Sequence, residues 1–137
     1  MNQNTHWLDG SMIYGSSDAT MNRVRSFAGG QLLVENVNGR EMLPTLGGQS
    51  SCNFKGCLNT GDLRATEQPQ LTTMHTIWVR EHNRIANTLS SLNPTWSDET
   101  VFQETRRIVV AQLQRITYDE FLPSLLSKHK SPVKTNV

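Results

Sequence analysis

The sequence lacks any long apolar stretch and any excess of charge of one sign. No run approaches the roughly 18 apolar residues that a membrane-spanning helix needs, and the opening residues MNQNTHWLDG lack the basic and apolar regions of a signal peptide. The 13 Lys and Arg residues are balanced by 12 Asp and Glu residues, which gives no strong field for nucleic acid or an anionic membrane surface. A chain of 137 residues is therefore predicted to form one domain without a membrane span.

Several signatures of known chemistry are also missing. The sequence has no internal repeat, no low-complexity tract, and no nucleophile elbow, phosphate-binding loop or metalloprotease motif. Hydrolase and nucleotide-binding functions therefore have no support. No Asn-x-Ser/Thr sequon with a permitted middle residue occurs, so glycosylation gives no indication of the compartment.

Cysteine is scarce, and the two that occur lie close together. Cys52 and Cys57 stand in the loop-like segment SSCNFKGCLNTG, where they could close a small disulfide ring or remain free thiols. A zinc site would need two more ligands at short spacing, and no other Cys or His lies nearby in the sequence. The residues alone leave the disulfide and the free thiols as alternatives.

The first half of the sequence favours loops and short elements. Its glycines, serines and short apolar patches are typical of turns, and Asn-Gly is a hairpin signal. In chain order, the sequence predicts an ordered loop over 1–17, a short helix over 19–28, two brief extended segments within 31–44 around Asn38-Gly39, and a loop over 46–62.

The second half favours helices, the first of them over residues 70–91. Pro69 suits the first turn of a helix, and Asn93-Pro94 ends it. The apolar residues between them recur at spacings of three, four and seven, which is helical periodicity. They are Leu71, Met74, Trp78, Ile85 and Leu89.

A second long helix is predicted from Ser97, as an N-cap, to Ile116. Thr117-Tyr118 is predicted to break it, ahead of a short helical turn in YDEFLPSLL. We expect the two long helices to pack against each other. Residues 127–137 are polar and contain proline, so they are expected to be frayed.

Two charged residues stand where the long loop enters the first long helix. In GDLRATEQPQL, Arg64 and Glu67 lie three residues apart, and both could point into one pocket as the chain turns. A functional arginine there would serve as a fixed cation for a developing negative charge. The alternative is a Glu favoured by the helix dipole beside an ordinary surface Arg.

Two further patterns have structural and functional interpretations. Thr5, Asp9 and Ser11 place oxygen atoms every few residues in a loop, as calcium requires, but a turn stabilised by Asp and Ser side chains would look the same. His75 and His82 lie seven residues apart on the first long helix, too far for a tight metal pair. The segment WVREHNR around His82 is interpreted as a polar helix face with charges paired across turns.

Four stretches together resemble the animal haem peroxidases, the family that includes myeloperoxidase, peroxidasin and insect chorion-type peroxidases. They are THWLDGSMIYG, LRATEQPQLTTMHTIWVREHNRIA, SLNPTW and ITYDEFLP. The resemblance covers Asn4 to Leu126. It implies a mostly α fold, in which 1–126 form part of an all-α peroxidase domain with two long helices and a loop-rich N-terminal half. Residues 127–137 would be a divergent, disordered tail.

The resemblance also implies roles for individual residues. Arg64 matches the catalytic arginine that polarises the peroxide O–O bond, and Glu67 matches the carboxylate that forms an ester with a haem methyl group. Gln68 replaces a methionine that forms a sulfonium link in myeloperoxidase, so that link is not expected. The implied cofactor is haem, and the implied partners are hydrogen peroxide and a phenolic or halide donor.

The same resemblance addresses the oxygen-rich loop and the cysteines. Thr5, Asp9 and Ser11, together with the backbone carbonyl of Trp7, match the calcium ligands of the family. Cys52 and Cys57 fall where relatives carry a disulfide. Disulfides belong to oxidising compartments, so an extracellular or secretory-vesicle location is expected for the parent protein.

Parts of the family pattern are missing. The distal histidine motif would lie upstream of this sequence and the proximal histidine motif downstream of YDEFLP, where the chain reads SKHKSPVKTNV. None of His6, His75, His82 and His129 fits either role. We therefore expect a central fragment of the catalytic domain, inactive in isolation and with helix faces exposed.

The sequence leaves three hypotheses about function. The first is a haem peroxidase oxidoreductase, as judged from the parent domain. The second is a non-catalytic, truncated member of the same family. The third is a helical interaction protein that binds an acidic partner through the surfaces of Arg80 with Arg84 and of Arg106 with Arg107.

Overall fold

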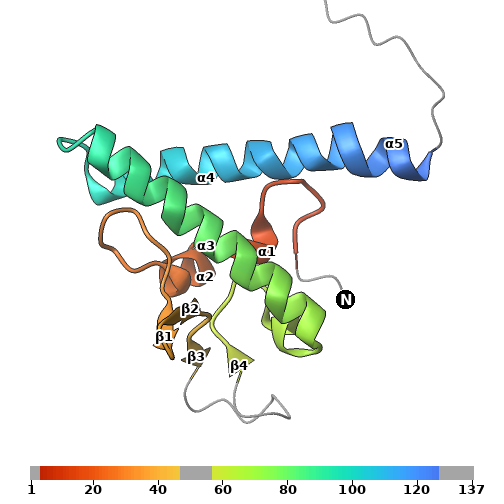
Figure 1. Cartoon of the computed structure of the whole chain (residues 1–137), viewed down its shortest axis with the longest axis horizontal. Helices are drawn as coiled ribbons and strands as arrows, with labels where there is room; N and C mark the ends of the chain where they lie inside the picture. The colour runs from red at the N-terminus through yellow and green to blue at the C-terminus, as the bar shows by residue number, and fades with distance from the viewer. Residues whose placement is uncertain (1–3, 47–56, 127–137) are drawn as a thin grey trace, which may run out of the picture.

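The computed structural model describes residues 4–46 and 57–126 and is dominated by helices, as predicted. Figure 1 shows α3 and α4 as two long arms that meet at a turn, with the small N-terminal elements on one side of them. The elements are α1 (Ser11–Tyr14), α2 (Asp18–Val24), β1 (Glu35–Val37), β2 (Arg40–Met42), β3 (Thr45–Leu46), β4 (Cys57–Leu58), the 3-10 helix η1 (Leu63–Thr66), α3 (Pro69–Leu92), α4 (Asp98–Arg115), the π-helix η2 (Ile116–Phe121) and α5 (Leu122–Leu125).

The two long helices form where the sequence predicts them. Pro69 is the first residue of α3, where a missing N–H costs no helical hydrogen bond. The helix ends at Asn93, whose backbone N–H and side-chain amide both donate to the carbonyl of Leu89. Ser97 then caps α4 by accepting from the N–H of Thr100. As expected, α3 packs against α4.

The predicted break at Thr117-Tyr118 is wrong. The Thr117 hydroxyl donates to the carbonyl of Leu113 at 2.8 Å, so it hydrogen-bonds within the helix and does not end it. The helix widens instead, and the N–H of Leu122 donates to the carbonyl of Thr117, five residues back. Consequently α4, η2 and α5 form one continuous rod (Figure 1).

The N-terminal half is more structured than the sequence indicates. The predicted helix over 19–28 ends already at Val24, because Arg25 takes an extended backbone (φ −82°, ψ 146°) and pairs with Leu32 in an antiparallel bridge. The ordered loop over 1–17 contains the single turn α1. The predicted hairpin is confirmed as antiparallel β1 and β2. The loop predicted over 46–62 is wrong at Leu46 and at β4, because Cys57 and Leu58 pair with β3 in a second small sheet.

The core joins α1 to the two long helices. Tyr14 is fully buried, and its hydroxyl lies 2.9 Å from Nδ1 of His82. The other ring nitrogen of His82 lies 2.9 Å from the carbonyl of Gly30. Since a carbonyl can only accept, Nε2 donates to it and Nδ1 accepts from Tyr14. The buried apolar residues of this core are Ile13, Tyr14, Val24, Leu32, Leu43, Val79, Ile85, Phe102 and Val109.

The interpretation of WVREHNR as a polar face with paired charges is wrong for His82 and confirmed for Glu81 and Arg84. His82 is 0% exposed, because two segments of the N-terminal half supply partners for both ring nitrogens. Burial lowers the pKa of His82 to about 4, against the hydrogen bond to Gly30, so the ring is neutral near pH 7. Glu81 and Arg84 do form an ion pair across one turn at 2.8 Å.

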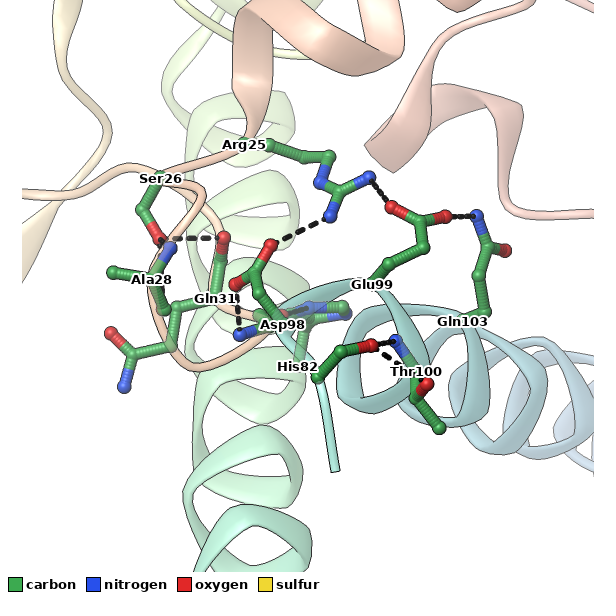
Figure 2. A network of polar contacts seen from close by, with 11 residues as sticks. Arg25, Ser26, Ala28, Gln31, His82, Asp98, Glu99, Thr100 and Gln103 are labelled. Carbon is green, nitrogen blue, oxygen red and sulfur yellow. Dashed lines mark hydrogen bonds and ion pairs between the residues drawn. The ribbon is translucent and has the colours of Figure 1, made fainter. Parts of the chain in front are cut away.

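A buried arginine fastens the segment after α2 to the start of α4. Arg25 donates to Asp98 and Glu99 (Figure 2), and its guanidinium lies 4.0 Å from the ring centroid of Phe102. The N–H of Gly30 donates to the other oxygen of Asp98 at 2.6 Å. Gly30 has φ +69°, and a Cβ there would lie 2.6 Å from the backbone nitrogen of Phe102, so the close approach requires glycine.

The far faces of the long helices stay uncovered, as predicted. Met74 and Ile77 on α3 are about half exposed, and the C-terminal rod exposes a row of large apolar side chains. That row comprises Ile116, Tyr118, Phe121, Leu125 and Leu126. No helix in the described part of the chain is both long and apolar enough to span a membrane.

Candidate functional site

Arg64 is held by a carboxylate two residues earlier in the chain. Asp62 caps η1, accepting from the backbone N–H of Arg64 at 3.0 Å. The same carboxylate accepts from Nε of Arg64 at 3.0 Å and from Nη2 at 2.8 Å, and Asn4 donates to it at 2.8 Å. The hydrogen bond from Arg64 lowers the pKa of Asp62 to about 2, despite burial. Asp62 is therefore an anion that fixes the guanidinium in place.

Arg64 and Glu67 share one hollow, as the sequence predicts. The N–H of Glu67 donates to the carbonyl of Arg64 at 2.9 Å, which places Glu67 at the end of η1. The Arg64 side chain is 46% exposed, and Glu67 is exposed as well. With Asp62, Leu71 and His75 they line a hollow of about 210 Å³ between η1 and α3.

The sequence analysis missed Asp62 and His75 as members of this hollow. Asp62 is detectable in GDLR, since an acid before a short helical turn is a typical N-cap. His75 is 7% exposed, and Nδ1 lies 2.8 Å from the carbonyl of Leu71. Nε2 is buried and has no partner among the described residues. Its burial depends on η1 packing on α3, which no local pattern indicates.

The oxygen-rich loop does bring its predicted residues together. The Thr5 hydroxyl donates to Asp9 at 2.9 Å and lies 3.2 Å from the Ser11 hydroxyl and 3.5 Å from the carbonyl of Trp7. Burial acts to raise the pKa of Asp9, but hydrogen bonds from Thr5 and Ser11 outweigh it and lower the pKa overall. The site thus offers one carboxylate with hydroxyl and carbonyl oxygens.

This donor set suits a hard cation only. Within the described ranges no three His, Cys, Asp or Glu residues gather where they could hold a metal ion. A cation at the loop would therefore be bound mainly through neutral oxygens, as calcium allows and zinc does not.

The cysteines and the tail are described only in part. Cys57 lies at the start of β4 and is 2% exposed. Cys52 lies outside the described residues, so the disulfide stays a prediction. Residues 127–137, with His129, also lie outside them.

The arginine surfaces of the interaction hypothesis are partly occupied. Arg84 pairs with Glu81, and Arg107 pairs with Glu104 at 3.2 Å. Arg80 donates to the carbonyl of Glu41, and the Arg106 guanidinium lies 5.4 Å from the ring centroid of Tyr14, so these contacts leave both charges unbalanced. Two of the four charges are paired, and nothing in the described residues favours an acidic partner, so this hypothesis gains no support.

The comparisons with known proteins agree on one family. A family model described as animal haem peroxidase matches residues 1–136. Chorion peroxidase of Drosophila melanogaster is 45% identical over 89% of this chain and 16% of its own length. The human peroxidasin homolog is 40% identical over 93% of this chain and 9% of its own length. Among solved structures, peroxidase A from Dictyostelium discoideum matches with a TM-score of 0.78 and 34% identity, over 85% of this chain and 24% of its own.

A more distant solved structure shares the fold. Fatty acid alpha-dioxygenase from Arabidopsis thaliana matches with a TM-score of 0.73 and 25% identity, over 88% of this chain and 17% of its own. The helical arrangement therefore occurs in both peroxidases and dioxygenases. In every one of these comparisons, the chain spans only a small part of the relative.

Proposed function

We propose that this chain, which belongs to the animal haem peroxidase family, supplies the catalytic arginine of a peroxidase site. The reaction would be the hydrogen peroxide-dependent oxidation of a phenolic or halide donor. The observation that supports this is the placement of Arg64, fixed by Asp62, beside an exposed Glu67 in one hollow. Both residues are exposed and line the hollow, so a haem could lie against them. Haem, when bound, would supply the redox chemistry of peroxide reduction.

Arg64 would act as a preorganised cation. Cleaving the O–O bond heterolytically places negative charge on the departing oxygen, and a guanidinium already fixed in position stabilises that charge without reorganising. Asp62 holds the guanidinium by Nε and Nη2, and Nη1 has no hydrogen bond to any described residue. Nη1 and the second N–H of Nη2 are therefore the donors that would be available to the bound peroxide.

Glu67 would tether the cofactor. Its carboxylate is exposed at the mouth of the hollow and lies where the family forms an ester with a haem methyl group. Gln68, the N-cap of α3, cannot form the sulfonium link that methionine provides. A single covalent attachment through this segment follows.

The oxygen-rich loop would bind calcium through Thr5, Asp9, Ser11 and the carbonyl of Trp7. The convergence of these oxygens on the Thr5 hydroxyl supports the proposal. We further propose a Cys52–Cys57 disulfide and, with it, an extracellular or secretory-vesicle location.

A non-catalytic family member is the second candidate. It is favoured by His82, whose two ring nitrogens are both committed to hydrogen bonds within the chain, and by the burial of His75. His82 has no nitrogen left to ligate iron, and Nε2 of His75, although unpaired among the described residues, is buried.

Reconstitution of the purified chain with haem and calcium distinguishes the two candidates. A chain that forms a working site by itself should give a Soret band and peroxide-dependent oxidation of a dye, whereas the inactive fragment expected from the sequence should give neither. Arg64→Gln should then lower the oxidation rate by about 10²- to 10³-fold with the Soret band retained. Haem should be extracted from Glu67→Gln by an acidic organic solvent, because this variant cannot form the ester. Arg84→Gln, on the exposed face of α3, is the matched control. Absence of both signals would reject the enzyme function for this chain and favour the non-catalytic candidate.

A further inference from the structure

We propose that Asn4 is a positioning residue for Arg64 and that it couples the oxygen-rich loop of residues 5–11 to that arginine. This inference rests on the proposed function of Arg64. The coupling runs through a short series of contacts, in which Thr5 is the centre of the loop, Asn4 is its neighbour in sequence, and Asp62 joins Asn4 to Arg64.

The Asp62–Arg64 pair needs an anchor from elsewhere in the chain. All the hydrogen bonds between the two residues span only two positions, and the one from the backbone N–H of Arg64 holds Oδ1 alone. These bonds therefore do not tie Oδ2 to any distant part of the chain. Asn4 donates to Oδ2 of Asp62 at 2.8 Å across a separation of 58 residues. That oxygen is also the one that receives Nη2 of Arg64. Asn4 therefore sets the direction of the carboxylate, and the carboxylate sets the direction of the guanidinium.

The backbone before Asp62 is docked on the same N-terminal segment. A Cβ at Gly61 would lie 2.4 Å from the backbone nitrogen of Gly15 and 2.5 Å from the backbone carbon of Ile13. Such close approach is possible only for glycine. The segment from Asn4 to Gly15 thus contacts the Arg64 segment twice, through a side-chain hydrogen bond and through packed backbone.

An ordered loop should therefore also restrict the motion of the Arg64 side chain. The Thr5 hydroxyl closes the loop on Asp9 and Ser11, and a cation bound by these oxygens would fix Thr5 and with it Asn4. Coupling of this kind is reciprocal, so a rigid Arg64 would also favour cation binding. Asn4 would thus link cation binding at the loop to the position of Arg64.

The test measures how fast the Nε–H of Arg64 exchanges with water, by NMR on the full chain labelled with ¹⁵N. Asn4→Leu keeps the size of the side chain but removes the donor, and Asn4→Gln keeps an amide donor. We expect about fivefold faster exchange in Asn4→Leu, the equivalent of one ordinary hydrogen bond, and partial rescue in Asn4→Gln. Asn22→Leu, at an exposed position of α2, is the matched control.

Calcium addition tests the coupling itself. Exchange at Arg64 should slow when calcium is added to the unaltered chain, and this slowing should be lost in Asn4→Leu and in Asp9→Asn. The backbone amide of Val79, in the core of α3, reports on global folding and should not change. Unchanged Arg64 exchange in Asn4→Leu would overturn the positioning role, and a calcium effect that is absent or survives in Asn4→Leu would overturn the coupling. Neither measurement depends on haem, so the peroxidase proposal can fail separately.

Discussion

Two of the arginines that pair with carboxylates, Arg25 and Arg64, lie in opposite settings. Arg25 is 4% exposed and binds Asp98 from 73 positions away, whereas Arg64 is 46% exposed and binds Asp62 from two positions away. A long-range buried pair ties separate elements together. A local, half-exposed pair does not by itself connect separate elements, and it leaves one side of the guanidinium facing a hollow. The comparison indicates that the Arg25 junction holds the fold and the Arg64 hollow is available for chemistry.

The two regions also differ in whether their histidines have hydrogen-bond partners for both ring nitrogens. At the Arg25 junction, His82 uses both ring nitrogens and Asp98 uses both oxygens. In the Arg64 hollow, Nε2 of His75 is buried without a partner among the described residues, and Glu67 is exposed. Buried polar groups in stable structures are almost always satisfied, and each region has one exception among the described residues, Nε of Arg25 at the junction and Nε2 of His75 in the hollow. His75 lines open space, so its unpaired nitrogen is the one that a bound group could reach.

The largest expected effect is at the centre of the junction. Phe102 is 0% exposed and its ring contacts Tyr14 and His82 at centroid distances of 5.9 and 5.4 Å. Phe102→Ala should lower the free energy of unfolding by about 3–5 kcal/mol, through lost burial and the cavity left behind. Urea denaturation measures it. Phe121→Ala, at a residue 56% exposed, is the matched control and should cost under about 1 kcal/mol; equal losses would show that the junction is not the core.

The next effect is a dependence on pH that belongs to the junction alone. Because the pKa of His82 is lowered from 6.5 to about 4 by burial, the unfolded chain binds a proton between these values that the folded chain does not. The stabilisation is thus complete above pH 6.5 and is lost as the pH falls towards 4, by roughly 3 kcal/mol.

The measurement is the free energy of unfolding of the unaltered chain and of His82→Gln, across that pH range. The difference between the two should shrink as the pH falls, whereas His6→Gln, at an exposed histidine, should follow the unaltered chain. The Asp62 carboxyl, with its pKa of about 2, titrates below this window. A constant difference between the unaltered chain and His82→Gln would mean that His82 does not titrate in the folded state as inferred.

The sequence predicted what depends on local patterns and missed what depends on distant contacts. Pro69, Asn93 and Ser97 mark the helix ends because capping is local. His82 was assigned to a polar face because its partners, Tyr14 and Gly30, lie 68 and 52 positions away. Periodicity cannot detect such partners.

The candidate site divides in the same way. Arg64 and Glu67 are visible as a charged pair at a helix entrance, and their roles come from the family resemblance. The anchoring of Asp62 by Asn4 depends on how α1 docks against Gly61. That contact requires Gly61, because any side chain there would collide with the backbone of Ile13 and Gly15. A single glycine in a loop gives no sequence pattern that predicts such a contact.

The smallest effect on stability should come from the arginine that matters most for chemistry. Arg64→Gln should lower the free energy of unfolding by about 1 kcal/mol only, since the guanidinium is half exposed and screened by solvent. Asp62 would also keep the donors from Asn4 and from the backbone of residue 64. Arg25→Gln should cost about 2–3 kcal/mol, because it removes a guanidinium that is 4% exposed and its charged hydrogen bonds to Asp98 and Glu99. Both variants can be compared in one urea series with the unaltered chain. If Arg64→Gln proved as destabilising as Arg25→Gln, the local pair would be a structural element, and the division between a junction that holds the fold and a hollow open to chemistry would not stand.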